Sequence, residues 1–167
     1  MFHSVVQVRC GQRRATKLCA LILPLSLWSG IAVADTTITS SSTAQKTSED
    51  GDITVTGTLS VGSDTAVTID SDNSFSNEGS TTAAKAGGIG VSVTSATSGS
   101  IANSGTITTG TAASSDTADD GVIGGSAIEV YQSVGGGISN AASSTIVTYG
   151  NNTIFIGTDA SNPADIT

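Results

Sequence analysis

Isoleucine and valine alternate with threonine and serine in short runs along this chain, and this alternation restricts the possible folds more than any other feature. Of the 25 Ile, Val, Leu and Phe residues after position 34, 22 are Ile or Val. β-Branched residues suit extended strands and form helices poorly, and a period of two puts one face of a strand inward. Gly, Asn and Asp separate the runs, as turns require. The sequence therefore predicts an all-β fold. The runs lie at 53–55, 59–61, 67–69, 91–93, 128–130 and 154–156.

An internal repeat accompanies the alternation. Three asparagines each follow an apolar residue by two positions, and two of the repeats superpose over 13 positions with a shift of 37 residues. Repeated short strands in a shared register are typical of a solenoid. The asparagines are predicted turn positions, left-handed or hydrogen-bonded, where one Asn stacks on the next. These turn positions are Asn77, Asn103 and Asn140, and the predicted repeat core is Phe75, Ile101, Ile138, Val91, Val93, Ile128 and Val130.

Intrinsic disorder is the alternative to a solenoid. Only 25 of the 133 residues after position 34 are Ile, Val, Leu or Phe, and this segment carries a net charge of 2 − 14 = −12. Such a composition lies near the boundary of disorder. The shared register of the repeats favours the solenoid, whose narrow interior needs few apolar side chains per rung. At about 20 residues per rung, we expect five or six rungs over residues 51–162, after a flexible Ser/Thr-rich lead-in at 35–50.

The first 34 residues have the order of a secretory signal peptide. A basic region with Arg9, Arg13, Arg14 and Lys17 precedes an apolar stretch at 18–28, and the small-residue site Ala32-Val33-Ala34 follows. This order predicts a helical signal peptide cleaved after Ala34. A membrane anchor is the competing interpretation, but about eleven apolar residues fall short of the roughly 20 needed to span a bilayer.

The residue types missing after position 34 exclude several functions. This segment has no Arg, His, Cys, Met or Trp, and Lys46 and Lys85 are its only basic residues. An acidic segment of this kind is a poor nucleic-acid binder, because nucleic-acid binding requires a basic surface. Without His or Cys there is neither a Ser-His or Cys-His nucleophile pair nor a zinc site of the usual kind. We therefore predict no catalytic, cofactor-binding or metal-binding residue.

Four groups of residues nevertheless resemble functional sites in part. The acidic turns could attract calcium but lack EF-hand spacing, and the Gly-rich segments lead into no helix that could cradle a phosphate. Glu129, the one acid on a clearly predicted strand, is expected to point outward into solvent. The Thr-x-Thr pairs occur on too few rungs for an ordered-water surface. The acidic turns are 49–52, 70–73 and 119–121, the Gly-rich segments 88–90 and 135–137, and the Thr pairs 54–56 and 106–108.

The segments Ile101–Ile107 and Gly135–Asn140, together with the long basic leader, resemble the passenger region of bacterial autotransporters, which use the type V secretion route. The resemblance covers about residues 51–157. It implies a right-handed parallel β-helix on the surface or outer membrane of a Gram-negative cell, or released from it. It also implies an outer-membrane β-barrel translocator, and as partners host molecules, cell-surface molecules or other copies of the chain.

The sequence departs from autotransporters in two respects. It has only a few rungs, and the expected β-barrel is absent, so that residues 163–167 would form an open truncated end. A truncated or split gene, or a fragment, would account for both. The expected function is a secreted or surface-displayed structural or adhesive segment without catalysis. A small β-helical enzyme acting on polysaccharides, using paired carboxylates, and a disordered exported remnant of a truncated gene remain the alternatives.

Overall fold

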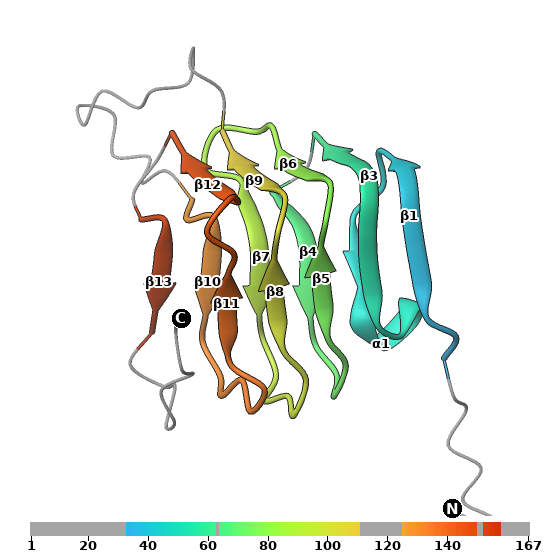
Figure 1. Cartoon of the computed structure of the whole chain (residues 1–167). Helices are drawn as coiled ribbons and strands as arrows, with labels where there is room; N and C mark the ends of the chain where they lie inside the picture. The colour runs from blue at the N-terminus through green and yellow to red at the C-terminus, as the bar shows by residue number, and fades with distance from the viewer. Residues whose placement is uncertain (1–32, 63, 111–124, 150–151, 158–167) are drawn as a thin grey trace, which may run out of the picture. The chain divides into compact units, whose positions relative to one another are not determined.

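The computed structural model describes residues 33–62, 64–110, 125–149 and 152–157. The fold is all-β, as predicted, with a single four-residue helix, α1 (Thr47–Asp50), among the described residues. The strands pair in parallel throughout and form three stacks (Figure 1). The chain visits the stacks in the same order each time, and we call one such passage a rung. The described residues form five rungs.

The first stack lies at the front of the molecule in Figure 1. It contains the beginning of β1 and of β3, followed by three short strands in strict parallel register. One column of this stack is apolar from the second rung onward, so that Ile53, Phe75, Ile101 and Ile138 lie over one another and are all buried. The strands are β1 (Thr36–Ser41), β3 (Ile53–Val61), β5 (Phe75–Asn77), β8 (Ile101–Asn103) and β11 (Ile138–Asn140).

The second stack continues from the first around a corner. β1 and β3 are long enough to contribute to both stacks, whereas later rungs use separate strands. β3 pairs with β5 through residues 53–55 and with β6 through residues 58–61, which leaves Gly57 at the corner. The additional strands are β6 (Ser80–Ala83), β9 (Thr106–Thr109) and β12 (Thr145–Thr148).

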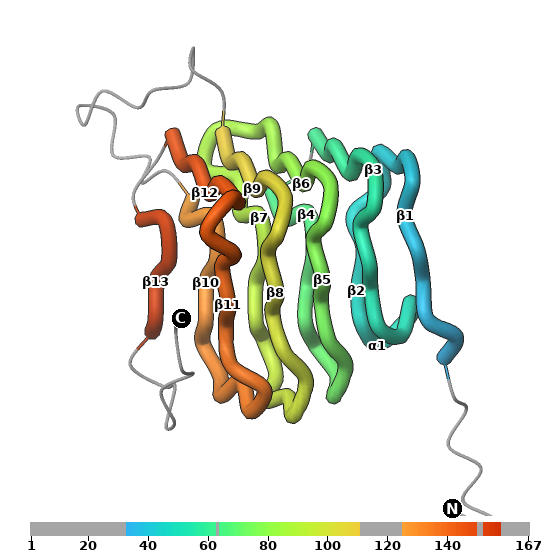
Figure 2. Tube along the Cα trace, viewed as in Figure 1, coloured from blue at the N-terminus to red at the C-terminus, as the bar shows by residue number. Residues whose placement is uncertain are grey.

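The third stack lies behind the first, as the tube in Figure 2 shows. Its columns are the most apolar, because one joins Val67, Val91, Ile128 and Ile154 and the next joins residues 69, 93, 130 and 156. This composition agrees with the alternation in the sequence, since every second residue faces the interior. The strands are β2 (Gln45–Lys46), β4 (Thr65–Ile69), β7 (Ile89–Val93), β10 (Ile128–Val130) and β13 (Ile154–Ile156).

The core is a thin apolar column between the three stacks. All seven residues expected to form the repeat core are buried, and the largest of them is Phe75, with no exposed surface. Burial of one such Ile, Val or Phe side chain stabilises the fold by about 1.5–3 kcal/mol. Each rung supplies only a few of these side chains, so stacking on the neighbouring rungs is needed to bury them.

The expectation of a flexible lead-in at 35–50 is wrong. These residues form β1, β2 and α1, which together make the first rung. The reason is backbone pairing: β1 lies on β3 from Thr36↔Ile53 to Ser41↔Leu59, with one irregularity, and its Ile38 is buried. A Ser/Thr-rich sequence forms a strand here because its neighbour supplies the hydrogen bonds and most of the apolar surface. The described residues include no helix that is long and apolar enough to cross a membrane.

Candidate functional site

The central polar feature is a ladder of side-chain amides inside the first stack, which we call the asparagine ladder (Asn77, Asn103 and Asn140). The three residues are direct register partners at the ends of β5, β8 and β11. Asn77 Nδ2 donates to Asn103 Oδ1 at 2.7 Å, and Asn103 Nδ2 donates to Asn140 Oδ1 at 2.8 Å. Asn77 and Asn103 are buried, whereas Asn140 is exposed. The ladder therefore links three rungs by hydrogen bonds from one side chain to the next.

The buried end of the ladder is closed by a threonine. Thr81 Oγ1 donates to Asn77 Oδ1 at 3.0 Å, and Asn77 Nδ2 also donates to the carbonyl oxygen of Thr106 at 3.0 Å. Thr81 has no exposed surface. Buried amides are costly unless hydrogen-bonded, and these bonds satisfy the side-chain amide of Asn77 within the core.

The left-handed alternative for the three asparagines is wrong. No non-glycine residue in the described part of the chain has a positive φ. Each Asn is the last residue of a strand and keeps an extended backbone. The cause is the pairing between rungs: an Asn whose side chain bonds to the Asn of the next rung needs the Cβ direction of a strand residue, which a left-handed turn would not provide.

A column of glycines lies two positions after Val55, Asn77 and Asn103, which are register partners. Gly57, Gly79 and Gly105 follow one another at the corner between the first two stacks, and none has a positive φ. A Cβ built on Gly79 would lie far inside van der Waals contact with the carbonyl oxygen of Gly57, and Gly105 stands in the same relation to Gly79. These glycines are required because successive backbones approach closely.

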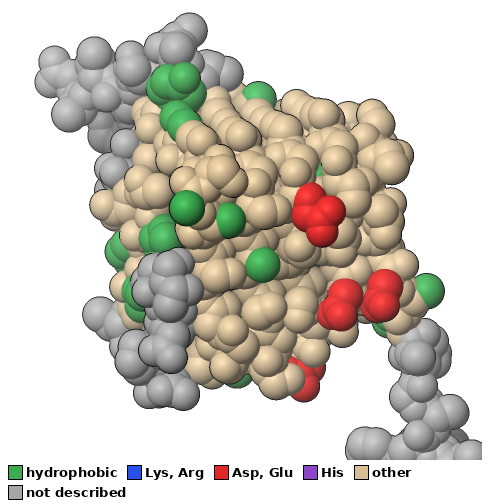
Figure 3. Space-filling model, viewed as in Figure 1, with side chains coloured by type: hydrophobic (Ala, Val, Ile, Leu, Met, Phe, Trp, Pro, Cys, Tyr) green, Lys and Arg blue, Asp and Glu red, His purple; other side chains and the backbone are tan. Residues whose placement is uncertain are grey.

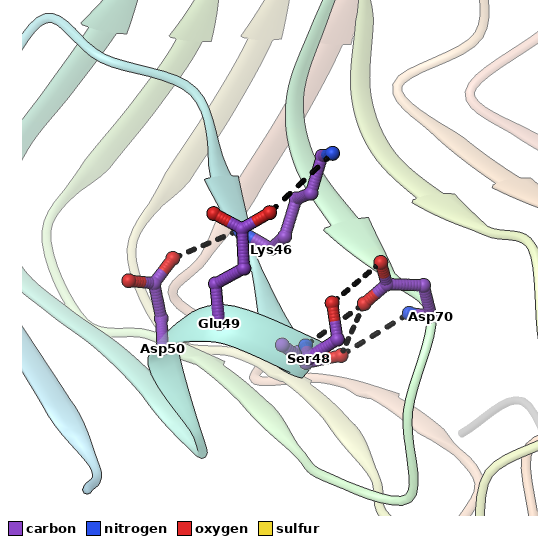
Figure 4. Close-up of polar contacts among 6 residues, drawn as sticks. Lys46, Ser48, Glu49, Asp50 and Asp70 are labelled. Carbon is purple, nitrogen blue, oxygen red and sulfur yellow. Dashed lines mark hydrogen bonds and ion pairs between the residues drawn. The ribbon is translucent and has the colours of Figure 1, made fainter. Parts of the chain in front are cut away.

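A second polar cluster fastens the first rung to the turn after the second. It consists of Thr47, Ser48, Asp70, Ser71 and Asn73 and is shown in part in Figure 4. The Asp70 carboxylate accepts from the Ser48 backbone N–H at 2.9 Å and from Ser48 Oγ at 2.8 Å. Thr47 Oγ1, which is buried, accepts from the Asp70 backbone N–H at 3.1 Å and from Ser71 Oγ at 2.7 Å.

The environment of Asp70 favours its ionised form. Burial raises the pKa of this carboxyl group, but the hydrogen bonds from Ser48 and Thr47 together outweigh burial and lower the pKa below the usual 3.8. Asp72 follows the same rule, since hydrogen bonds from the backbone and side chain of Ser98 lower its pKa. These two turn carboxylates therefore act as acceptors that tie one turn to a neighbouring segment.

The expectation that Glu129 points into solvent is wrong. Only 9% of the Glu129 surface is exposed to solvent. Its Oε2 accepts from the Tyr131 hydroxyl at 2.8 Å and its Oε1 from the Ser126 backbone N–H at 3.3 Å. The outward position of β10 is enclosed because Tyr131 bonds to the carboxylate and Phe155 is its cross-strand partner. The hydrogen bond to Glu129 raises the pKa of Tyr131 most, and burial and the charge of Glu129 raise this pKa further.

The other weak candidates form no site among the described residues. No group of three His, Cys, Asp or Glu side chains within these residues could hold a metal ion. Lys46 forms an exposed ion pair with Glu49 at 3.6 Å, and Lys85 pairs with Asp64. Gly137 has a positive φ of 78°, as a corner requires, but Gly90 lies within β7 instead of at a corner. Asp119 and Asp120 lie outside the described residues, as does the interval 163–167.

The predicted cleavage site lies at the edge of the described chain. Ala32 is outside it, and Ala34 is exposed and belongs to no strand. The next ordered interactions follow at once, because Asp35 Oδ1 accepts from the Asp52 backbone N–H at 3.3 Å and Thr36 begins β1. Cleavage after Ala34 would leave every described strand intact.

The sequence patterns did not predict two of the polar partners. Thr81 closes the asparagine ladder, and Thr47 organises the second cluster, yet both look like ordinary surface threonines in an alternating sequence. The spacing Asn77-x-x-x-Thr81 could have indicated the first, since it brings the two side chains to the same corner. Nothing in the sequence around Thr47 indicates its bonds to residues more than 20 positions away.

No protein-family model, curated protein or solved structure matches this chain.

Proposed function

We propose that this chain is a structural segment of an exported bacterial surface protein, folded as a right-handed parallel β-helix and without catalytic activity. The in-register stacking of five rungs in three parallel stacks carries the proposal. Parallel strands joined by crossovers are right-handed in almost all proteins, which supports the proposed hand. The asparagine ladder supports the proposed solenoid, because a regular solenoid brings the same position of each rung together.

The exposed surface is suited to adhesion and display. The face in Figure 3 consists mainly of uncharged polar side chains and backbone, with a few acidic groups and no visible Lys or Arg. An acidic surface of this kind favours solubility and is repelled by anionic lipid and nucleic acid. The proposed contacts are therefore made to host molecules, other cell-surface molecules or further copies, through hydroxyl and amide groups.

The leader and the residue usage support export. A cleavable signal peptide would end at Ala34, and the chain beyond it has no cysteine. A chain without disulfides can thread through a pore unfolded, as the autotransporter resemblance would require. An outer-membrane β-barrel translocator is the proposed partner in this export.

Export is tested by expressing the full chain in a Gram-negative host and measuring the mass of the fractionated product. The expected product begins at Asp35, in the periplasm or at the surface. Ala34→Leu should block cleavage, because signal peptidase requires a small residue there, whereas the matched Ala34→Ser should be processed normally. Retention of the uncleaved wild-type chain in the cytoplasm would contradict the proposal.

Handedness and catalysis need separate measurements. An experimental structure of residues 35–167 should show right-handed progression of the rungs, and a left-handed path would overturn the proposed fold. Incubation of the purified chain with a panel of bacterial and host polysaccharides should release no new reducing ends. Release that depends on Glu129 would favour the enzymatic alternative.

A further inference from the structure

The outer face of the second stack, at the top of the molecule in Figure 1, carries a regular array of hydroxyl groups. In β3, β6 and β9 buried residues alternate with outward ones, and each strand has two outward Ser or Thr residues in this stack. Register pairing places them in two columns that run without irregularity through three successive rungs. We call the six residues the hydroxyl lattice; they are Thr58, Ser80 and Thr106 in one column and Ser60, Thr82 and Thr108 in the other.

The hydroxyl lattice has two fixed repeats. Neighbouring rungs lie about 4.7–4.9 Å apart, and the two columns are separated along each strand by two residues, or about 6.6 Å. Between the columns, Leu59, Thr81 and Ile107 are buried and hold each strand against the core. The β-branched Thr side chain is restricted at χ1, so its hydroxyl group is held close to one position before any ligand binds.

The lattice hydroxyl groups form no hydrogen bond with other residues that the structure describes. Hydroxyl groups beside the lattice behave differently. At the corner next to it, Thr56 Oγ1 donates to the carbonyl oxygen of Ile38 at 3.4 Å, and Ser104 Oγ donates to that of Asn77 at 3.3 Å. The lattice therefore presents its donors and acceptors outward, in register.

The lattice is uncharged, although the chain after position 34 has 14 acidic and two basic residues. A hydroxyl group both donates and accepts hydrogen bonds, whereas a carboxylate only accepts and an ammonium group only donates. Such an array complements an uncharged partner whose groups also donate and accept at regular spacing. The surface of ice has this chemistry, because each water molecule in it is held at a lattice position. A polysaccharide fits less well, since the lattice has no aromatic ring to stack on a sugar.

The Thr-x-Thr pairs of the sequence understate this array. Thr106 and Thr108 belong to it, but Thr54 pairs with Ser76 in the first stack. The other two rungs of the lattice each combine one Ser with one Thr, so that a Thr pair occurs on one rung while two hydroxyl groups occur on all three. Only the register between rungs shows which hydroxyl groups lie over one another.

We propose that the hydroxyl lattice binds ice, through hydrogen bonds to water molecules at the crystal surface. This inference goes beyond the proposed structural and adhesive role, and it depends neither on export nor on the hand of the helix. The Thr methyl groups between the hydroxyl groups contribute apolar contact with the same surface. Thr145 continues the first column by one rung, and Val147 ends the second.

Ice-affinity partition of the full chain tests the proposal. A slowly growing ice crystal takes up a protein that binds it and excludes other solutes, so the measurement is the fraction of the chain recovered in the ice. Thr82→Tyr places a bulky ring on the middle rung and should lower this fraction by at least about tenfold, as loss of a central contact does. Thr54→Tyr is the matched control, because Thr54 is also a half-buried outward strand residue but lies on another stack. It should be recovered like the native chain.

A second variant adds to the lattice instead of disrupting it. Ser60→Thr combined with Ser80→Thr completes a Thr pair on all three rungs, at outward strand positions that suit Thr. This double variant should be recovered in the ice at a higher fraction than the native chain at the same freezing rate. Circular dichroism checks the fold of each variant, and if Thr82→Tyr does not fold, the double variant decides the outcome.

Exclusion of the native chain from the ice would overturn the proposal. Equal recovery of folded Thr82→Tyr and Thr54→Tyr would overturn it too, as would a double Ser→Thr variant without any gain. Exclusion from ice together with retention on microcrystalline cellulose or chitin, lost in Thr82→Tyr, would identify a neutral polysaccharide as the ligand. A dimer in sedimentation equilibrium that Thr82→Tyr abolishes would identify a second copy instead.

Discussion

Asn77 Nδ2 lies 2.7 Å from Asn103 Oδ1 and donates a hydrogen bond to it. The two residues belong to adjacent rungs, although they are 26 positions apart in the sequence. Both side chains are enclosed in the core. A hydrogen bond in this environment contributes modestly when present and is costly when one partner is removed. This asymmetry makes the ladder the most informative place to perturb the fold.

Asn103→Ala should destabilise the chain more than any other substitution in the ladder. It leaves Asn77 Nδ2 without one acceptor and opens a cavity, so we expect a loss of about 2–4 kcal/mol in the free energy of unfolding. Asn140→Ala, at the exposed end, should cost less than about 1 kcal/mol. Urea denaturation of residues 35–167 measures both, and equal losses would show that the ladder does not act as a buried network.

Two buried threonines should respond in opposite directions to the same substitution. Thr81 Oγ1 donates to Asn77 Oδ1, whereas Thr109 Oγ1 is buried without a hydrogen-bond partner among the residues that the structure describes. Thr81→Val should lower the free energy of unfolding by about 1–2 kcal/mol, and Thr109→Val should raise it by up to about 1 kcal/mol. Thermal melts of the two variants provide the comparison, each serving as the control for the other.

Gly79→Ala should be strongly destabilising although its backbone conformation is available to any residue. The new Cβ would collide with the carbonyl oxygen of Gly57, which belongs to a paired backbone and cannot move freely. Gly62→Ala is the matched control, because a Cβ there meets nothing within 4 Å. We expect a loss of about 2 kcal/mol or more for the first and little change for the second. A tolerated Gly79→Ala would mean that the rungs are farther apart at this corner.

Phe75→Ala tests the thin core. Phe75 is fully buried and is the largest side chain in the interior, and its truncation should cost about 3–5 kcal/mol. Phe155→Ala removes the same group from a position that is 37% exposed and should cost much less. Near-complete loss of the β signal in circular dichroism at 37 °C is expected for the first variant alone.

Asp70 should make stability depend on pH in the acid range. Its pKa is lowered in the folded chain, so the unfolded chain binds more protons between the two pKa values. The stabilisation is complete above the unfolded value of about 3.8 and is lost as the pH falls through the lower folded value. Ser48→Ala removes one donor to the carboxylate and should move the pKa of Asp70 upward. Carboxyl-carbon NMR titration measures that shift, and Asp70→Asn should remove this part of the pH dependence.

Much of the fold could be predicted from the alternation of residues. Ile and Val at every second position gave the strands of the third stack, and the repeats at Val91 and Ile128 correspond to true register partners. The failures have a common cause. β1 has too few apolar residues to look like a strand, and Glu129 looks like a surface residue, because in both cases the partners that order or cover them are distant in sequence.

The sequence by itself determined the all-β class, the apolar positions that face inward and the spacing that puts an asparagine in each of three rungs. Only the tertiary structure decided that these amides form a buried, directional ladder, that Gly57, Gly79 and Gly105 must lack side chains, and that Thr47 and Thr81 are structural. The physical reason is that alternation is a local property of one strand. Hydrogen bonding and close approach between rungs depend instead on which residues of different rungs come to lie over one another.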